Sequence, residues 1–311
     1  MPQRFVALCM FPLLAACADL AGTGQSTIGA QASGEPLLAE TTRSQSSFEV
    51  EAFFTRVETN LLARGLLRAD GGGPDSPFTD EMLARNFENL AFSEEFSSSQ
   101  GQIIRRSAES TLHRWATRVR VEPIIGPSVS VEQAEQDTRL IANFVDRLAR
   151  VTNHPIQMVP RNGNFQVLIL NDQELRNSAP PLRKLMPELS LRETNFVEQM
   201  SRDTYCVVFA SDPGQDGRYE RAVAVIRAEL PDVLRTSCIH EEIAQGLGLS
   251  NDSASARPSI FNDDDEFGRL TYHDELLLQI LYDERLQPGM SLDESSSIVR
   301  SISRTLLAPN S

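Results

Sequence analysis

The sequence predicts an α+β (mixed α/β) fold with a mixed sheet, and three observations lead to this prediction. Four short apolar runs, at 115–121, 165–170, 205–210 and 222–226, have the length and composition of strands. Stretches with helical spacing separate them, and the last two runs follow each other closely. Strands that alternate with helices, together with a pair of neighbouring strands, indicate a sheet that is not purely parallel.

The chain begins with the features of an export signal. Arg4 supplies a positive charge, and the uncharged run Phe5–Ala16 is too short to span a bilayer as a permanent helix. The next residues, Leu14-Ala15-Ala16-Cys17, resemble a lipobox, so residues 1–16 are predicted to be a lipoprotein signal peptide that is cut before Cys17. The alternative is an ordinary signal peptide with an accidental cysteine.

Lipid on Cys17 would hold the protein to a membrane of the cell envelope. Lipoproteins with Asp after the cysteine tend to stay in the inner membrane, and this chain has Ala18 there. The periplasmic face of the outer membrane is therefore the favoured location. The membrane, reached through Cys17, is the first predicted partner.

Three regions follow the signal. Residues 17–47 contain almost no large apolar side chain and are predicted to be a lipidated flexible linker. Residues 48–106 are predicted to be an N-terminal helical region, with helices over 48–67 and 79–91. Residues 107–311 form the main domain, in which Ser130 caps a helix with the apolar stripe Leu140, Phe144 and Leu148.

Cysteine usage and charge limit the classes of function. Cys9 leaves with the signal and Cys17 takes the lipid, so Cys206 and Cys238 remain to form one disulfide outside the cytoplasm, or to stay as two separate thiols. The formal net charge of -14 argues against nucleic-acid binding. No nucleic-acid partner is expected.

The stretch Cys238–Asp252 carries the chemistry. The pattern H-E-x-x-H-x-x-G-x-x-H-D of metzincin proteases falls on six of its residues: Glu241, Glu242, Gln245, Gly248, Asn251 and Asp252. Glu241 and Gln245 share one helical face, opposite the apolar face of the same helix. Glu242 stands where a general base would polarise water, and Gly248 would turn the chain so that Asn251 returns beside the helix.

Downstream segments extend the resemblance. Ser259-Ile260-Phe261 stands where metzincins have their Met-turn, and a helix opens after Thr271 with Asp274 as its capping-box partner. The chain more closely resembles the bacterial lipoprotein family known as domain of unknown function 2927. The segments HEEIAQGLGLSND, RPSIFND and YDERLQPGM carry that resemblance. That family name carries no established activity. The metzincin pattern implies a zincin/metzincin-like domain with an active-site-type helix, preceded by a small helical unit, with Gly248, Asp252 and Phe261 supporting a cleft.

The replaced residues change the expected chemistry. Glu241, Gln245 and Asn251 stand at the three zinc-histidine positions, and their oxygen atoms suit calcium, magnesium or manganese better than zinc. No cofactor is therefore certain, and a divalent metal that prefers oxygen ligands is possible. Other interpretations are a solvated face of the helix, a solvated acidic loop at 263–266, and a metal site from His240 and His273.

Three functions follow in order. The leading one is a degenerate metzincin-like protease domain that binds or scaffolds a peptide or an envelope protein through the retained cleft. The alternative is a metal-dependent hydrolase of peptide or cell-wall material, with Glu242 as general base and Glu241, Gln245 and Asn251 as metal ligands. The third is a structural component of an envelope assembly.

Overall fold

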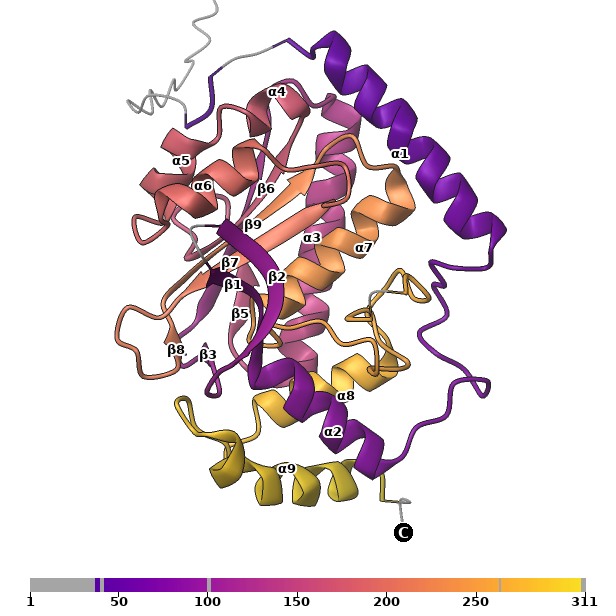
Figure 1. Cartoon of the computed structure of the whole chain (residues 1–311), viewed down its shortest axis with the longest axis vertical. Helices are drawn as coiled ribbons and strands as arrows, with labels where there is room; N and C mark the ends of the chain where they lie inside the picture. The colour runs from indigo at the N-terminus through magenta and orange to yellow at the C-terminus, as the bar shows by residue number, and fades with distance from the viewer. Residues whose placement is uncertain (1–36, 40–41, 100–101, 263, 309–311) are drawn as a thin grey trace, which may run out of the picture. The chain divides into compact units, whose positions relative to one another are not determined.

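The computed structural model describes residues 37–39, 42–99, 102–262 and 264–308, without the side chains of 94–109. The predicted signal peptide, Cys17 and most of the linker lie outside the described residues. Residues 37–311 form one compact unit. Its elements, shown in Figure 1, are α1 (Gln45–Ala63), α2 (Asp80–Ala91), β1 (Ser93–Ser99), β2 (Gln102–Glu109), β3 (Arg114–Trp115), β4 (Val119–Ile125), α3 (Val131–Thr152), β5 (Ile156–Met158), β6 (Phe165–Leu170), α4 (Asp172–Leu175), α5 (Ala179–Leu185), α6 (Leu191–Glu198), β7 (Cys206–Ser211), β8 (Arg218–Tyr219), β9 (Arg221–Arg227), α7 (Asp232–Gln245), α8 (Tyr272–Leu281) and α9 (Leu292–Leu306).

The mixed sheet has five strands in the order β5-β4-β6-β9-β7. Strands β5, β4, β6 and β9 run parallel, whereas β7 is antiparallel to β9, with Cys206 opposite Ile226 and Ser211 opposite Arg221. The predicted α+β class with a mixed sheet is confirmed. The antiparallel strand stands at the edge of the sheet, next to α7.

The central strands bury both faces, so they read as continuous apolar runs rather than alternating ones. Every residue of β6 is buried. One face packs with α3 and α7 in the larger core, through side chains such as Val167 and Ala224. The other face packs with α5 and α6, through Leu168 and Val223. Figure 1 shows α3 and α7 together on one side of the sheet.

Strand β4 differs in its bounds from the strand expected at 115–121. The expected strand is divided into two: β3 ends at Trp115, and β4 begins at Val119 and continues through Pro123 to Ile125. Val121 accepts a hydrogen bond from Val159 just past β5, so Pro123, two residues on, faces the side where β5 has already ended. The missing N–H of proline therefore removes no ladder bond.

Helix α1 packs on the same core as the sheet. Its fully buried Phe54 lies edge-on to Tyr205, with ring centroids 5.4 Å apart. At its start, Ser47 donates a hydrogen bond to buried Glu229, just past β9, at 2.7 Å. Burial raises the pKa of Glu229. The N-terminal helix is thus tied to the sheet by both apolar and polar contacts.

Helices α2, α8 and α9 pack against one another at the end of the unit distant from α4 (Figure 1). Ser130, Thr271 and Ser291 each accept a backbone hydrogen bond at the N-terminus of a helix, as expected for the first two. Among the described helices, none is long and apolar enough to cross a membrane.

Candidate functional site

Helix α7 begins without a cap of its own. Its N-cap residue is Pro231, whose side chain accepts no hydrogen bond. Glu58 of α1 takes that role, because its Oε2 accepts from the backbone N–H of Val233 at 3.0 Å and of Leu234 at 2.9 Å. These are the N–H groups that a capping side chain usually satisfies, and a carboxylate also suits the positive end of the helix dipole.

The apolar face of α7 matches the predicted helical wheel. Ile239, Ile243 and Leu247 are fully buried in the larger core. The opposite face is also largely covered: Glu242 and Gln245 are each 4% exposed, and Glu241 is partly exposed. Most of the polar face of α7 therefore lies inside the protein, and of these three residues Glu241 reaches solvent.

A disulfide joins the helix to the edge of the sheet. Cys206, the first residue of β7, is bonded to Cys238 in α7, with their Cα atoms 5.9 Å apart. Cys238 is buried and Cys206 is partly exposed. The bond fixes the antiparallel edge strand against the helix that carries the candidate residues.

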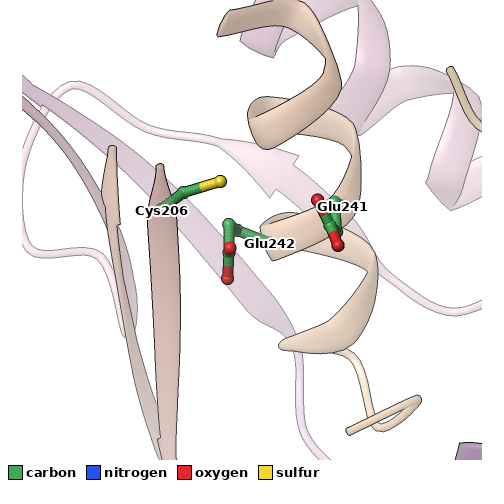
Figure 2. Close-up of side chains that lie close together, drawn as sticks. All are labelled: Cys206, Glu241 and Glu242. Carbon is green, nitrogen blue, oxygen red and sulfur yellow. The ribbon is translucent and has the colours of Figure 1, made fainter. Parts of the chain in front are cut away.

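Two carboxylates lie beside this disulfide. The Cys206 sulfur and one carboxylate oxygen from each of Glu241 and Glu242 all lie within 4.8 Å of one another. Figure 2 shows the Cys206 side chain extending from β7 toward α7, with Glu242 between the strand and the helix. The structure thus brings together Glu241 and Glu242 and adds Cys206, which the sequence had assigned only to the disulfide.

The two amides predicted as metal ligands have contacts of their own. Gln245 donates from Nε2 to Oδ1 of Asp252 at 2.7 Å. Asn251 is buried and donates from Nδ2 to the backbone carbonyl of Asn89, in α2, at 3.0 Å. Asp252 therefore pairs with Gln245, while the Asn251 amide is turned toward α2.

The chain turns after α7 under close contact. Gly248 has φ +130, and a Cβ atom there would lie 2.1 Å from the backbone oxygen of His113, so only glycine fits. Two aromatic side chains donate hydrogen bonds to backbone carbonyls just after α7. Trp115 Nε1 donates to the Gly246 carbonyl at 2.8 Å, and the Tyr282 hydroxyl donates to the Leu247 carbonyl at 3.0 Å. Burial raises the pKa of Tyr282.

The segment Ser259–Phe261 forms a buried turn before α8. Asp274 accepts from Ser259 Oγ at 2.6 Å and from the Ile260 N–H at 3.0 Å. The same carboxylate forms the capping box with Thr271 at the start of α8. Phe261 is fully buried in the core. One buried carboxylate thus fixes both the turn and the next helix.

The comparisons with known proteins give a family. A family model described as "Protein of unknown function (DUF2927)" matches residues 80–301. The chain belongs to the DUF2927 family. No curated protein and no solved structure matches it. The match includes β7, α7 and the disulfide but not α1, so Glu58 lies outside the matched region of this DUF2927 protein.

A zinc ion of the metzincin kind does not fit this site. Zinc prefers imidazole and thiolate, and the Cys206 sulfur is already bonded to Cys238. His240 stacks on Phe144 with ring centroids 4.0 Å apart, and its Nδ1 accepts from the Leu270 N–H at 3.2 Å. Burial lowers the pKa of His240 to about 3, with the positive charges of Arg147 and Arg269 adding to the effect.

The other three histidines also lie outside the group formed by Cys206, Glu241 and Glu242. His273 is fully buried, with its Nε2 3.1 Å from Nδ2 of Asn86. His113 lies 2.8 Å from the Thr111 carbonyl, and His154 lies 2.9 Å from the Thr117 carbonyl. These four are all the histidines of the sequence. None of them belongs to the group formed by Cys206, Glu241 and Glu242.

The acidic segment at 263–266 is described from Asp264 onward. Glu266 is bridged by Arg257, 2.6 Å away, and by Arg68, 3.1 Å away. These arginines, Arg257 first, lower the pKa of Glu266. The carboxylate of Glu266 is thus held in ion pairs.

Sequence reasoning missed two contacts around the site: Glu58 caps α7, and the Asn89 carbonyl accepts from Asn251 in the segment after α7. Glu58 lies more than 170 residues before its partners, and no local pattern marks a cap supplied by another helix. Asn89 contributes a backbone carbonyl, which any residue could supply. The lipobox-like segment around Cys17 lies outside the described residues.

Proposed function

We propose that this DUF2927 protein is an envelope lipoprotein that binds an extended peptide segment without cleaving it. The peptide would lie along the outer edge of β7, beside the carboxylates of α7, as an added strand. The observation that carries the proposal is the position of β7. It is an antiparallel edge strand that a disulfide links to α7, and the carboxylates of Glu241 and Glu242 lie beside its first residue, Cys206. Strand addition to a sheet edge is a common mode of peptide recognition.

The outer edge of β7 offers backbone groups for such binding. In the described part of the chain, the only strand that pairs with β7 is β9. The Arg227 N–H donates to the Tyr205 carbonyl at 3.3 Å, and Cys206 lies opposite Ile226. Since antiparallel bonds alternate, residues 207, 209 and 211 are expected to bond with β9. Cys206, Val208 and Ala210 then direct their N–H and C=O groups outward.

Charge favours a basic peptide. Glu241 is partly exposed beside the start of β7, and the whole chain carries a formal net charge of -14. A lysine or arginine side chain of a peptide on β7 would come within reach of this carboxylate. Complementary charge adds specificity and speeds association more than it adds affinity.

Binding without cleavage is supported by the residues that replace the zinc ligands. The amides of Gln245 and Asn251 are held by Asp252 and by α2, and all four histidines have other surroundings. The site therefore offers no conventional set of zinc ligands to activate a water molecule.

The proposal is tested with a fluorescein-labelled octapeptide of alternating valine and threonine with one central lysine. Fluorescence anisotropy should show binding, and N-methylation of alternate peptide amides should weaken it at least about tenfold, because backbone hydrogen bonds are lost. Val208→Pro should weaken binding similarly, since it removes an outward N–H and no predicted ladder bond. Strand addition would be refuted if the methylated peptide bound as tightly as the unmethylated one and if Val208→Pro bound the peptide as tightly as the natural chain.

The charge component has its own matched comparison. Replacing the central lysine of the peptide by glutamate should weaken binding to the natural chain. The difference between the two peptides should shrink in Glu241→Gln and stay unchanged in Glu284→Gln, which alters an exposed carboxylate on another loop. An unchanged difference in Glu241→Gln would remove Glu241 from the proposed binding site.

The lipid anchor is a separate part of the proposal, supported by the sequence around Cys17. Cys17→Ser should abolish incorporation of a fatty-acid probe and leave uncleaved or released protein. Unchanged labelling of Cys17→Ser would refute the lipobox assignment.

A metal-dependent hydrolase is the second candidate, favoured by the closeness of Glu241 and Glu242 at the sheet edge. In that case Glu242 would act as general base, and Glu242→Gln would lower peptide hydrolysis by about 10²-fold or more. The two candidates thus differ in whether the bound peptide is cut.

A further inference from the structure

Four possible metal ligands surround the disulfide. Cys238, Glu241 and Glu242 lie at i, i+3 and i+4 on α7, where side chains share one face of a helix. Cys206 approaches them from β7, and its sulfur lies within 4.8 Å of carboxylate oxygens from both Glu241 and Glu242. Two sulfur and two carboxylate groups therefore meet between one strand and one helix. Figure 2 shows three of them, Cys206, Glu241 and Glu242.

In the oxidised protein the two sulfur atoms cannot serve as metal ligands, because a thiolate is the ligand form of cysteine. Reduction changes this set. Two thiolates and two carboxylates are a donor set that tetrahedral zinc accepts. Zinc bond lengths of about 2.3 Å to sulfur and about 2.0 Å to oxygen place tetrahedral ligand atoms about 3.5 Å apart. For Cys206, Glu241 and Glu242 the observed limit of 4.8 Å requires a contraction of about 1 Å, which side-chain rotation can provide. The Cys238 sulfur, which is bonded to Cys206 in the oxidised chain, must move away from it once the bond is reduced.

We propose that reduction of the Cys206–Cys238 disulfide converts this place into a divalent metal site, with Cys206, Cys238, Glu241 and Glu242 as ligands. The site is distinct from the set Glu241, Gln245 and Asn251, since it uses both sulfur atoms and neither amide. It goes beyond the proposed peptide binding and does not depend on it.

The reduction needs a two-electron reductant, and a dithiol supplies it in two exchange steps. One thiolate of the reductant attacks the partly exposed Cys206 sulfur, the bond to Cys238 breaks, and Cys238 leaves as a thiolate. The second thiol of the reductant then displaces Cys206, so the reductant is oxidised to a disulfide and the protein gains two thiols. Metal binding releases both thiol protons, because the ligands must be deprotonated.

Burial explains why the oxidation state should act as a switch. Cys238 and Glu242 are 2% and 4% exposed, so adding two thiolate charges beside these carboxylates is costly, and a bound divalent ion lowers that cost. The ion can bind only after the sulfur atoms are released. Oxidation removes two of the four ligands and expels the ion.

The test is a Co²⁺ titration of the purified full chain, anaerobically, with and without a phosphine reductant. The reduced chain should bind one Co²⁺ per molecule and show a thiolate-to-cobalt charge-transfer band in the near ultraviolet. The oxidised chain should show no such band. A reduced chain that binds no Co²⁺, or an oxidised chain that binds it equally, would overturn the proposal.

Variants identify the ligands. Glu241→Gln and Glu242→Gln should each weaken Co²⁺ binding to the reduced chain at least about tenfold, since loss of groups that merely support a ligand already costs 10–100-fold. Glu284→Gln should bind as the natural chain does. Unchanged affinity in both Glu241→Gln and Glu242→Gln would show that the carboxylates are not ligands and refute the four-ligand site.

If reduction lowers the stability of the fold, metal binding is tested by the change that Zn²⁺ causes in the unfolding temperature. An ion that binds only the folded state raises its stability. Zn²⁺ should therefore raise the unfolding temperature of the reduced chain more than that of the oxidised chain, and less in Glu242→Gln. A Zn²⁺ effect that is the same in the reduced and oxidised chains contradicts the switch.

Discussion

Removing the Glu58 carboxylate should destabilise α7, although Glu58 lies on another helix. Its Oε2 accepts two backbone N–H groups, at 3.0 and 2.9 Å, at a helix start where Pro231 supplies no cap. Loss of a capping side chain costs about 0.5–2 kcal/mol, and hydrogen bonds to a charged group lie at the upper end of the ordinary range. We expect Glu58→Ala to lower the free energy of unfolding by about 2 kcal/mol.

The assay is urea unfolding followed by circular dichroism, with thermal unfolding beside it. A loss of about 2 kcal/mol corresponds to a fall of about 3 to 4 °C in unfolding temperature for a unit of this size. Glu58→Gln keeps an acceptor but loses the charge, so it should lie between the natural chain and Glu58→Ala.

Glu49→Ala is the matched control, because Glu49 is an exposed glutamate on the same helix. It should change the free energy of unfolding by less than about 0.5 kcal/mol. If Glu58→Ala and Glu49→Ala unfold alike, the reasoning that α1 caps α7 is wrong.

Three further predictions concern the residues around α7. Gly248→Ala should cost at least about 2 kcal/mol, because its Cβ would lie 2.1 Å from the His113 oxygen at φ +130; ordinary stability in urea would contradict this. Arg235→Met should cost about 3–5 kcal/mol by leaving Asp137, its buried partner at 2.8 Å, without its ion pair, and a loss below about 1 kcal/mol would show that the pair matters little. His240 has a folded pKa of about 3 against 6.5 unfolded, so the unfolded state binds the proton first as pH falls. Its contribution is complete above about pH 6.5 and lost toward pH 3, with a slope of up to about 1.4 kcal/mol per pH unit. Urea unfolding from pH 7.5 to 4.5 should show a flatter slope in His240→Leu, and an identical slope would refute the assignment.

Much of the fold could be predicted from periodicity alone. Strand β6 has the predicted bounds, 165–170, because continuous apolar runs mark strands buried on both faces. Helix α9 was not predicted, although its N-cap Ser291 and Glu294 form a capping box. Its apolar residues Val299 and Ile302 also lie three apart on the buried face, so the sequence carried both the cap and the stripe that identify a helix.

The candidate site was predictable only in part, for a physical reason. The local periodicity predicts the helix that carries Glu241 and Glu242, and two cysteines left over in a chain expected to be exported predict a disulfide. Local spacing cannot show that β7 brings Cys206 beside those carboxylates, because this contact depends on sheet order. Nor can it show that the Asn251 amide turns toward α2, because its partner is a backbone carbonyl.

Mass spectrometry of the lysine-centred octapeptide after incubation with the purified full chain tests the central claim most directly. The incubation is run without metal and with Zn²⁺, Mn²⁺ or Ca²⁺, and binding is followed in the same samples by anisotropy. Binding with the peptide intact in every condition is the predicted result. Peptide cleavage that Glu242→Gln lowers by about 10²-fold or more would contradict the account and establish the hydrolase instead.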